Sequence, residues 1–426
     1  MTEELVKKVL YTAAHGGFFL ERVPLGGGGA VCEQLVKEWR QTSPFPFELI
    51  TPAILGGEAP QGKDLVRLSE WAYARFCRAF GNAVTRAILT RDPSKTIVLC
   101  NDVSEGPDFR LLAERGYPLY TIYHVDVVDY FTRIYMKQIL RPEATTHFYR
   151  WLSSTPLRAL VPGVAELIFK KQQDSVMNSR GLIVPSNEMR DVLVRCYPVY
   201  QDKIHVLPWG IWDEPLAPVA LENEINHLRS AYPVPPGSAT LLMLSRISPE
   251  KGQDRVLKAL TLWEKQDDFP AAGVVLFIAG EAAYMLGSRF MKKLTRLAGE
   301  LHRTRVIFIG YASGARKQAL FRLADLYLFT SRHESYGLTL MEAMRAGCPV
   351  LATSSHGARD VFQPGVGEML PPAPEEDIPG LLRDGLRRLL SDRNRLTSMG
   401  EAARRYASAQ KFSDTAARLA KLLQEA

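Results

Sequence analysis

Short apolar segments alternate with longer amphipathic stretches along almost the whole chain. In the first half these segments are residues 9–13, 47–51, 96–100, 119–124, 181–185 and 204–207, and in the second half they are 240–244, 274–279, 305–309, 326–329 and 349–352. Apolar runs of this length, separated by stretches long enough for helices, are typical of buried parallel strands covered by helices. The pattern therefore predicts an α/β protein with two doubly wound parallel sheets.

The division between the two sheets is predicted from prolines. Six of them (Pro208, Pro215, Pro218, Pro233, Pro235 and Pro236) flank a short charged helix, as is typical of a restrained connector. We predict a first domain at 1–210, a linker at 211–236, a second domain at 237–405 and a C-terminal helix at 406–426 that packs back on the first domain. Within the first domain we expect a helix over Ala30–Arg40 and several helices and loops over 126–180.

Composition narrows the class of protein. The 426 residues are 46% hydrophobic and 23% charged, as in globular proteins. The first ten residues, MTEELVKKVL, are too charged for a secretory signal, and no apolar run reaches the ~18 residues of a membrane span, so we expect a cytoplasmic protein. Five scattered cysteines (Cys32, Cys77, Cys100, Cys196 and Cys348) lack metal-ligand spacing and are interpreted as buried thiols.

Charge is modest and well mixed. The net charge of +7 comes from bases interspersed with acids, so nucleic acid is not an expected partner. The last fifth is richer in arginine: Arg387, Arg388, Arg393, Arg395, Arg404 and Arg405. Two interpretations stay open for these arginines, namely solvated faces of surface helices and peripheral contact with the inner face of an anionic membrane.

The stretch Ser331–Met344, SRHESYGLTLMEAM, carries the most specific chemistry. Seven residues separate Glu334 from Glu342, with a strand end before the pair and a helix opening near Gly337. Gly337 lets the backbone approach a ligand closely, and the first amides of the helix suit a phosphate. Glu342, about one turn into the helix, is placed to accept two vicinal hydroxyls such as those of a ribose.

A second group of residues follows the first strand of the second domain. The run Leu244–Gly252, LSRISPEKG, places Arg246 and Lys251 in the loop after that strand. Paired cationic donors at such a position can hold a diphosphate and stabilise it as a leaving group. The alternative is an ordinary basic loop.

Both runs resemble motifs of the retaining glycosyltransferases of family 4, the E-x7-E motif and the R-x-x-x-x-K-G signature. The resemblance implies the GT-B fold, in which two doubly wound Rossmann-like domains face each other across a cleft. It makes 1–210 the acceptor-side domain and 237–405 the nucleotide-sugar-binding domain. It further implies that Glu342 holds the nucleotide ribose and that Glu334 faces the donor sugar. The diphosphate would then be bound by Arg246, Lys251 and the amides of Gly337, Leu338 and Thr339.

The first domain offers thinner evidence. The run Gly26–Ala30, GGGGA, precedes the expected helix, so Gly28 and Gly29 are candidate donor contacts, although a flexible loop and a contact through Gly16–Gly17 stay open. His124 ends the segment YTIYH, where family members carry a histidine beside the donor sugar. Trp209 stands where the family commonly has an asparagine, so no side-chain hydrogen bond is expected from it.

No D-x-D triplet occurs in the chain, so we expect no obligatory metal and no cofactor besides the nucleoside-diphosphate sugar that serves as co-substrate. A uridine diphosphate sugar is the expected donor, and the acceptor is left open among saccharides, lipids and small metabolites. The resemblance implies retention by front-face attack, with double displacement on a carboxylate as the alternative. The rival functions are a nucleotide-sugar epimerase or phosphorylase and an inactive nucleotide-sugar-binding protein.

Overall fold

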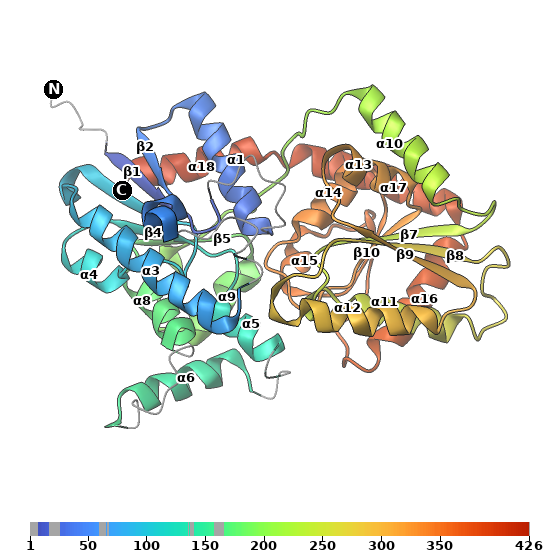
Figure 1. Cartoon of the computed structure of the whole chain (residues 1–426), viewed down its shortest axis with the longest axis horizontal. Helices are drawn as coiled ribbons and strands as arrows, with labels where there is room; N and C mark the ends of the chain where they lie inside the picture. The colour runs from blue at the N-terminus through green and yellow to red at the C-terminus, as the bar shows by residue number, and fades with distance from the viewer. Residues whose placement is uncertain are drawn as a thin grey trace. The chain divides into compact units, whose positions relative to one another are not determined.

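The computed structural model describes residues 7–16, 26–58, 65, 68–134, 136, 140–156 and 166–425. The chain divides into two compact units, the first made of 1–209 together with 412–426 and the second of 210–411 (Figure 1). The stretch 211–236, which we predicted as a linker, lies in the second unit, where helix α10 (Pro218–Ala231) packs against α13 (Gly314–Leu323). The last helix, α18 (Phe412–Gln424), belongs to the first unit.

The first unit is built on a six-stranded parallel sheet of order β2-β1-β3-β4-β5-β6. Its strands are β1 (Lys8–Thr12), β2 (Phe47–Ile50), β3 (Thr96–Cys100), β4 (Leu119–Ile122), β5 (Gly181–Val184) and β6 (Ile204–Val206). The central strands β3, β4 and β5 are buried along their whole length, as the apolar runs predicted. The strand order reverses at β1, which lies between β2 and β3, and ligands bind beyond the carboxyl ends of strands at such a point.

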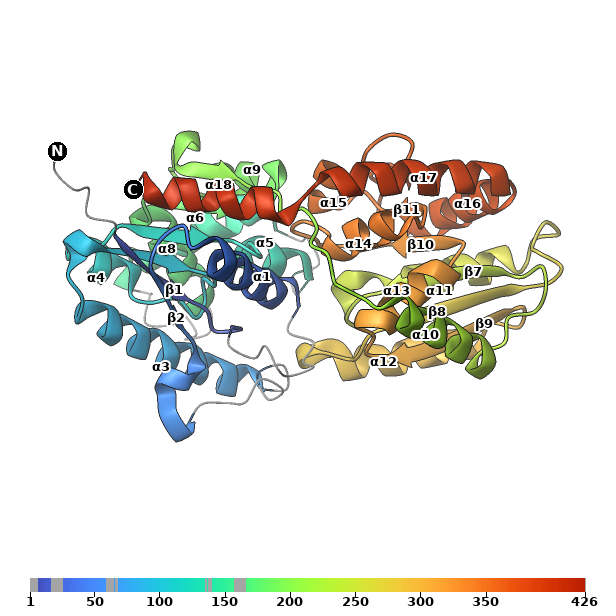
Figure 2. The same ribbon diagram turned by 90° about the horizontal axis from the view of Figure 1, so that it is seen from above.

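The α-helices of this unit are α1 (Gly27–Thr42), α3 (Glu70–Leu89), α4 (Phe109–Glu114), α5 (Val127–Ile134), α6 (Pro142–Ser153), α8 (Lys171–Asn178) and α9 (Asn187–Cys196). Helix α1 begins at Gly27 rather than near Ala30. Gly26 is the residue before the helix and has a non-helical backbone with φ 82°, and the glycines that follow it form the first helical turn. Figure 2 shows α18 beside α1, where Trp39 Nε1 donates a hydrogen bond to the carbonyl of Ala416 at 3.2 Å.

The second unit has a six-stranded parallel sheet of order β12-β11-β10-β7-β8-β9. Its strands are β7 (Ala239–Leu244), β8 (Val274–Ala279), β9 (Thr304–Gly310), β10 (Leu326–Phe329), β11 (Val350–Ala352) and β12 (Gly367–Met369). The order reverses between β7 and β10, as in the Rossmann arrangement. The sequence pattern missed β12, because its three residues are only half-buried and form no apolar run.

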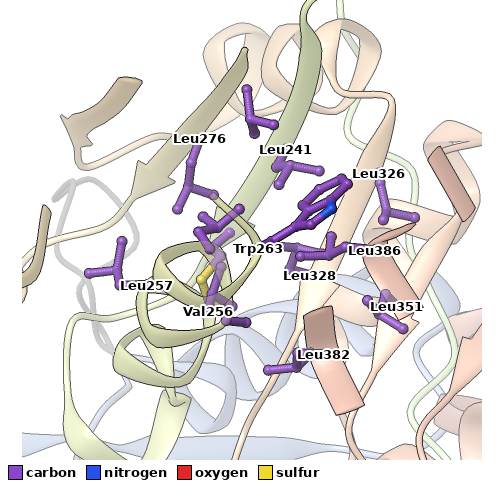
Figure 3. Packing of buried hydrophobic residues seen from close by; sticks show 14 of the residues in the cluster. Leu241, Val256, Leu257, Trp263, Leu276, Leu326, Leu328, Leu351, Leu382 and Leu386 are labelled. Carbon is purple, nitrogen blue, oxygen red and sulfur yellow. The ribbon is translucent and has the colours of Figure 1, made fainter. Parts of the chain in front are cut away.

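The core of the second unit fills the space between strands and helices. The helices besides α10 and α13 are α11 (Gln253–Trp263), α12 (Tyr284–Gly299), α14 (Leu338–Ala346), α15 (His356–Val361), α16 (Ile378–Leu390) and α17 (Arg393–Ala409). Figure 3 shows Trp263 of α11 among leucines of the strands, with Leu382 and Leu386 of α16 closing the layer. Burial of such side chains stabilises the unit by about 1.5–3 kcal/mol each.

All five cysteines are free and buried, as their interpretation as structural thiols predicted. Across the part of the chain that the structure describes, no helix combines the length and apolar character needed to cross a bilayer.

Candidate functional site

Two loops of the second unit meet where its strand order reverses. One follows β7 and runs to Gly252, and the other follows β10 and runs to Gly337. Gly252 has φ +70°, and a Cβ there would lie 2.1 Å from the carbonyl oxygen of Thr330, so only glycine fits between the loops. The Thr330 hydroxyl also donates to the Gly252 carbonyl at 3.0 Å. The backbone itself therefore fixes the spacing of the two loops.

An ion pair joins the same loops through their side chains. Lys251 Nζ lies 2.7 Å from Glu334 Oε2, and the two side chains are only 15% and 16% exposed. Burial raises the pKa of Glu334, but Lys251, His333 and Arg246 together lower it by more, so the net pKa lies below the usual value. Glu334 is consequently a carboxylate at neutral pH.

Arg246 lies on the same loop as Lys251. Its Nη2 is 3.7 Å from Glu250 Oε1, and its backbone carbonyl accepts a hydrogen bond from Gln253 Nε2 at 2.8 Å. Arg246 also helps to lower the pKa of Glu334, which places its charge near the ion pair. The structure thus brings together three of the predicted residues: Arg246, Lys251 and Glu334.

Helix α14 begins directly after the second of these loops. Gly337 precedes it with φ 100°, a left-handed conformation that favours glycine, and Leu338 and Thr339 are the first helical residues. The first amides of a helix and the positive end of its dipole suit an anion, and a contact of this helix end with a diphosphate stays a prediction. Glu342 follows in the second turn, and the helix ends at Gly347, as the sequence predicted.

Glu342 has a partner that sequence analysis missed. Lys317, on α13, lies 2.9 Å from Glu342 Oε1 and 2.9 Å from Glu214 Oε1. Beside this group the second unit has a pocket of about 280 Å³ whose lining includes Trp212, Leu338 and Arg345. Nothing in the run ASGARKQ around Lys317 distinguishes it from an exposed basic helix face, so sequence offered no indication of this contact.

A second missed residue is Arg332, inside the Glu334 loop. Its guanidinium donates to Asp254 Oδ1 at 2.9 Å and also pairs with Glu375. Asp254 is only 3% exposed on its side chain and is paired as well with Lys293 at 2.7 Å. These ion pairs tie the loop after β10 to α11 and hold the base of the site in place.

In the first unit, His124 lies two residues beyond the end of β4, not at the strand end that we predicted. Its Nε2 donates to Asn101 Oδ1 at 3.0 Å, and the Tyr11 hydroxyl donates to the same oxygen at 2.6 Å. Burial lowers the pKa of His124 to about 4, so the imidazole is neutral at pH 7. Trp209 packs against its ring with centroids 5.5 Å apart.

Of the two candidate glycine groups, the Gly26 run lies closer to His124. A Cβ on Gly28 would be 3.1 Å from the His124 ring, and Gly29 shares the first turn of α1. Gly16 instead faces Ala13 and Cys32, and Gly17 lies outside the described residues. The first turn of α1 and His124 therefore form one corner of the first unit.

The sequence also did not reveal a pair of residues at the point where the strand order of the first sheet reverses. His15 follows β1 and Asp102 follows β3, with Nδ1 and Oδ1 3.4 Å apart. Burial raises the pKa of Asp102, but its interactions with His15, His124 and the Ala14 amide together lower it by more, so the net pKa lies below the usual value. The position of Asp102 two residues after a buried strand was the available indication.

Several arginines of the last fifth pair with acids or carbonyls of the second unit. Arg387 pairs with Asp268 at 3.3 Å, Arg395 approaches Glu368 at 3.9 Å, and Arg404 donates to the carbonyl of Ala346. Exposed pairs of this kind contribute about 0–1 kcal/mol. These contacts favour solvated helix faces, and membrane contact stays a prediction.

Among the described residues, no group of three or more His, Cys, Asp and Glu side chains is arranged to hold a metal ion. The need for a metal is therefore a question for experiment, and the expectation of a metal-independent reaction stays a prediction.

Comparison with protein families matches residues 224–406 to the group described as glycosyl transferases group 1, a range that lies entirely within the second unit. A curated relative, the alpha-monoglucosyldiacylglycerol synthase of Streptococcus pneumoniae, is 33% identical over 174 residues, which cover 40% of this chain and 37% of that protein. Other curated relatives are matched over 36% to 58% of their own length.

Solved structures are similar over nearly the whole chain. Sucrose-phosphate synthase from Thermosynechococcus elongatus gives a TM-score of 0.72 at 17% identity, covering 98% of each chain. The Anabaena protein HepE, in complex with UDP and glucose, gives 0.62 at 16% identity, covering 99% of this chain and all of the other. With two doubly wound parallel units, the chain has the GT-B fold. Its second unit is similar to group 1 glycosyl transferases.

Proposed function

We propose that this protein is a retaining glycosyltransferase of family 4 that moves a sugar from a nucleoside-diphosphate sugar to an acceptor hydroxyl. The observation that carries the proposal is the Lys251–Glu334 ion pair at the strand-order reversal, with Arg246 beside it. The same loop leads directly into the anion-binding end of α14. A site with two cations, a helix N-terminus and an ionised carboxylate suits a diphosphate joined to a sugar.

The proposed reaction assigns a role to each group. The bond between the sugar C1 and the phosphate oxygen breaks, its electron pair leaves with the diphosphate, and a bond from the acceptor oxygen to C1 forms on the same face. The leaving phosphate oxygen takes the acceptor's proton. Arg246, Lys251 and the amides of Leu338 and Thr339 stabilise the departing charge, and Glu334 orients the donor sugar.

A uridine diphosphate sugar is the favoured donor. The similar structure of HepE holds UDP and glucose, which supports this choice, and the similar Streptococcus protein is named for an alpha-linked glucolipid product. An alpha-linked product is what retention from an alpha-configured donor gives. The acceptor is assigned only as a hydroxyl of a saccharide, a lipid or a small metabolite, and we propose that the first unit binds it.

The first test is a thermal-shift screen with UDP, ADP, GDP and the corresponding glucose donors, because a ligand that binds only the native state stabilises it. The tightest donor is then incubated with candidate acceptors, and both free nucleotide and the anomeric configuration of the product are measured. Nucleotide release that requires an acceptor, with a retained anomeric configuration, is expected. An inverted product would contradict retention.

The same assay distinguishes a glycosyltransferase from the two alternative functions. A nucleotide-sugar epimerase would change the sugar without releasing nucleotide, and an inactive binding protein would be stabilised by nucleotide without any turnover. The ionised Glu334 beside two cations favours a catalytic site over a binding site alone, because a charged pair that is mostly buried costs free energy to maintain.

Replacing Glu342 by alanine is expected to weaken nucleoside diphosphate binding about tenfold, the loss expected for one hydrogen bond to a charged group. The ribose contact would be made in the ground state and the transition state alike, so KM should rise with little change in kcat. Calorimetric titration checks the prediction, with Glu401→Ala on the exposed face of α17 as the control. Parental affinity in Glu342→Ala would remove the ribose assignment.

Turnover is expected to survive a strong chelator. Arg246, Lys251 and the positive end of α14 supply the charge that a divalent cation would otherwise bring to the diphosphate. The measurement is nucleotide release with and without EDTA after extensive dialysis. Loss of activity that Mg²⁺ or Mn²⁺ restores would show that these residues do not replace a metal.

A further inference from the structure

Lys317 is a lysine with only 10% of its side chain exposed, and it has two carboxylate partners. It comes from the first turn of α13, while Glu342 comes from α14 and Glu214 from the segment that opens the second unit. Both nitrogen–oxygen distances are 2.9 Å. Lysine is rarely buried unless it is paired, so the two carboxylates explain why Lys317 can lie mostly buried in the second unit.

The contact uses one oxygen of Glu342 and leaves the other open. Lys317 Nζ donates to Oε1, and within the described residues no hydrogen bond reaches Oε2. Glu342 is 17% exposed, and the pocket of about 280 Å³ borders it. A ligand hydroxyl can therefore reach the carboxylate while Lys317 stays in place.

Charge balance explains why Glu342 needs this partner. Burial raises the pKa of Glu342 above its usual value, the charge of Glu214 raises it further, and Lys317 offsets part of this rise by stabilising the charged form. A protonated carboxyl would accept hydrogen bonds from sugar hydroxyls less strongly than a carboxylate does. Without Lys317, the acid at this position would lose both its charge and its fixed direction.

We propose that Lys317 is the positioning residue that holds the Glu342 carboxylate in the orientation that binds the ribose hydroxyls of the donor nucleotide. The inference rests on the proposed function, because it assumes that a ribose occupies this place. Glu214 holds the lysine from its other side, so the ammonium cannot turn away from Glu342. Specificity for ribose over deoxyribose is then a property of the pair Lys317–Glu342, not of Glu342 alone.

The test compares the affinities of UDP and 2′-deoxy-UDP for the full chain by calorimetric titration. Lys317→Met removes the charge while keeping much of the apolar stem, and Arg316→Met is the matched control. Arg316 is the neighbouring residue of α13 and pairs with Glu224 of α10 at 3.6 Å, so its loss also removes one cation and one ion pair from this helix. Of these two neighbours, Lys317 is the one that pairs with Glu342.

The parent is expected to bind UDP about tenfold more tightly than 2′-deoxy-UDP, as one hydrogen bond to a charged group predicts. In Lys317→Met the affinity for UDP should fall about tenfold and the two ligands should bind nearly equally. Arg316→Met should keep the parental ratio. Lys317→Gln, which can still donate a hydrogen bond but has no charge, should fall between the two and serves if the methionine variant does not fold.

A parental ratio in Lys317→Met or in Lys317→Gln would overturn the inference while leaving the donor site intact. If the parent binds another nucleoside diphosphate more tightly, the same pair of ribose and 2′-deoxyribose ligands is used with that base. If the parent binds none of them, the proposed function fails first and the inference fails with it. If it binds both sugars equally, Glu342 does not contact the 2′-hydroxyl and the inference is wrong.

Discussion

Replacing Lys251 by alanine is expected to lower kcat by roughly 10²–10³-fold and to change the Kd for the nucleoside diphosphate much less. Negative charge on the diphosphate grows as its bond to the sugar breaks, so a cation at this position contributes most in the transition state. Loss of Lys251 also leaves Glu334 buried without its partner, 2.7 Å away in the parent, and raises the pKa of that carboxyl. Both effects act against turnover.

Steady-state kinetics with the donor and acceptor found in the screen measure this effect, and titration with the nucleoside diphosphate measures binding separately. Arg246→Ala should show the same pattern with a smaller effect, because Arg246 lowers the pKa of Glu334 less than Lys251 does. Lys258→Ala, at an exposed position on α11, changes the charge equally and should leave kcat unaltered. Near-parental kcat in both Lys251→Ala and Arg246→Ala would remove these two residues from the mechanism.

Replacing Asp254 by asparagine should destabilise the second unit by about 3 kcal/mol, the lower end of the cost of breaking a buried ion pair. Asp254 is nearly inaccessible and is the common partner of Arg332 and Lys293. Once its charge is gone, Arg332 keeps Glu375 and the carbonyl of Pro249, and the loop that carries Glu334 loses one of its two ion-pair partners. The midpoint of thermal unfolding should fall by roughly 6–12 °C for a unit of this size.

The same carboxylate predicts how stability depends on pH. Burial raises the pKa of Asp254, but Arg332 and Lys293 lower it by more, and the net pKa in the folded protein lies below its usual value. A depressed folded pKa contributes stability that is fully present above the unfolded value of about 3.9 and is lost as pH falls through the folded value. The difference in stability between the parent and Asp254→Asn should therefore be constant near neutral pH and shrink below about pH 4.

Calorimetry from pH 7 down to pH 3 can follow this difference. Glu401→Gln is the control, because Glu401 is 68% exposed and its pair with Arg405 spans 4.0 Å. Its unfolding midpoint should match the parent's at each pH. A midpoint for Asp254→Asn equal to the parent's at pH 7 would show that the ion pairs do not anchor the loop.

Much of the fold could be predicted because most of its strands are short, largely apolar runs, and eleven of the twelve strands in the described residues were found in this way. These include edge strands such as β6, which are only partly buried but still apolar in sequence. β12 escaped because its three residues, Gly367–Met369, contain a single apolar side chain and form no such run. The start of α1 was placed three residues late, because the glycine run was interpreted as a loop, whereas it forms the first turn of the helix.

The site residues that stand in short local motifs could be predicted from the sequence. Those that meet their partners only through the packing of distant segments could not. Lys251 and Glu334 stand in short runs beside glycines, so their loops could be recognised, and the structure brings them together. Lys317 and Arg332 act through partners distant in sequence, and no local pattern encodes such a pairing. His15 and Asp102 meet only because β1 and β3 are neighbours in the sheet.

Because α18 belongs to the first unit, the second unit is inserted into the sequence of the first, and the chain does not simply end with it. Its first and last residues lie side by side, since Ile211 bridges to Lys411 and its amide donates to the carbonyl of Gln410 at 2.7 Å. Gly210 is needed there, because a Cβ would stand 2.9 Å from that same carbonyl oxygen. The segment 210–411 can therefore be excised as one piece with adjoining ends, or replaced by another such segment. Cutting the chain after 411, by contrast, would strip from the first unit the helix that accepts the hydrogen bond of Trp39.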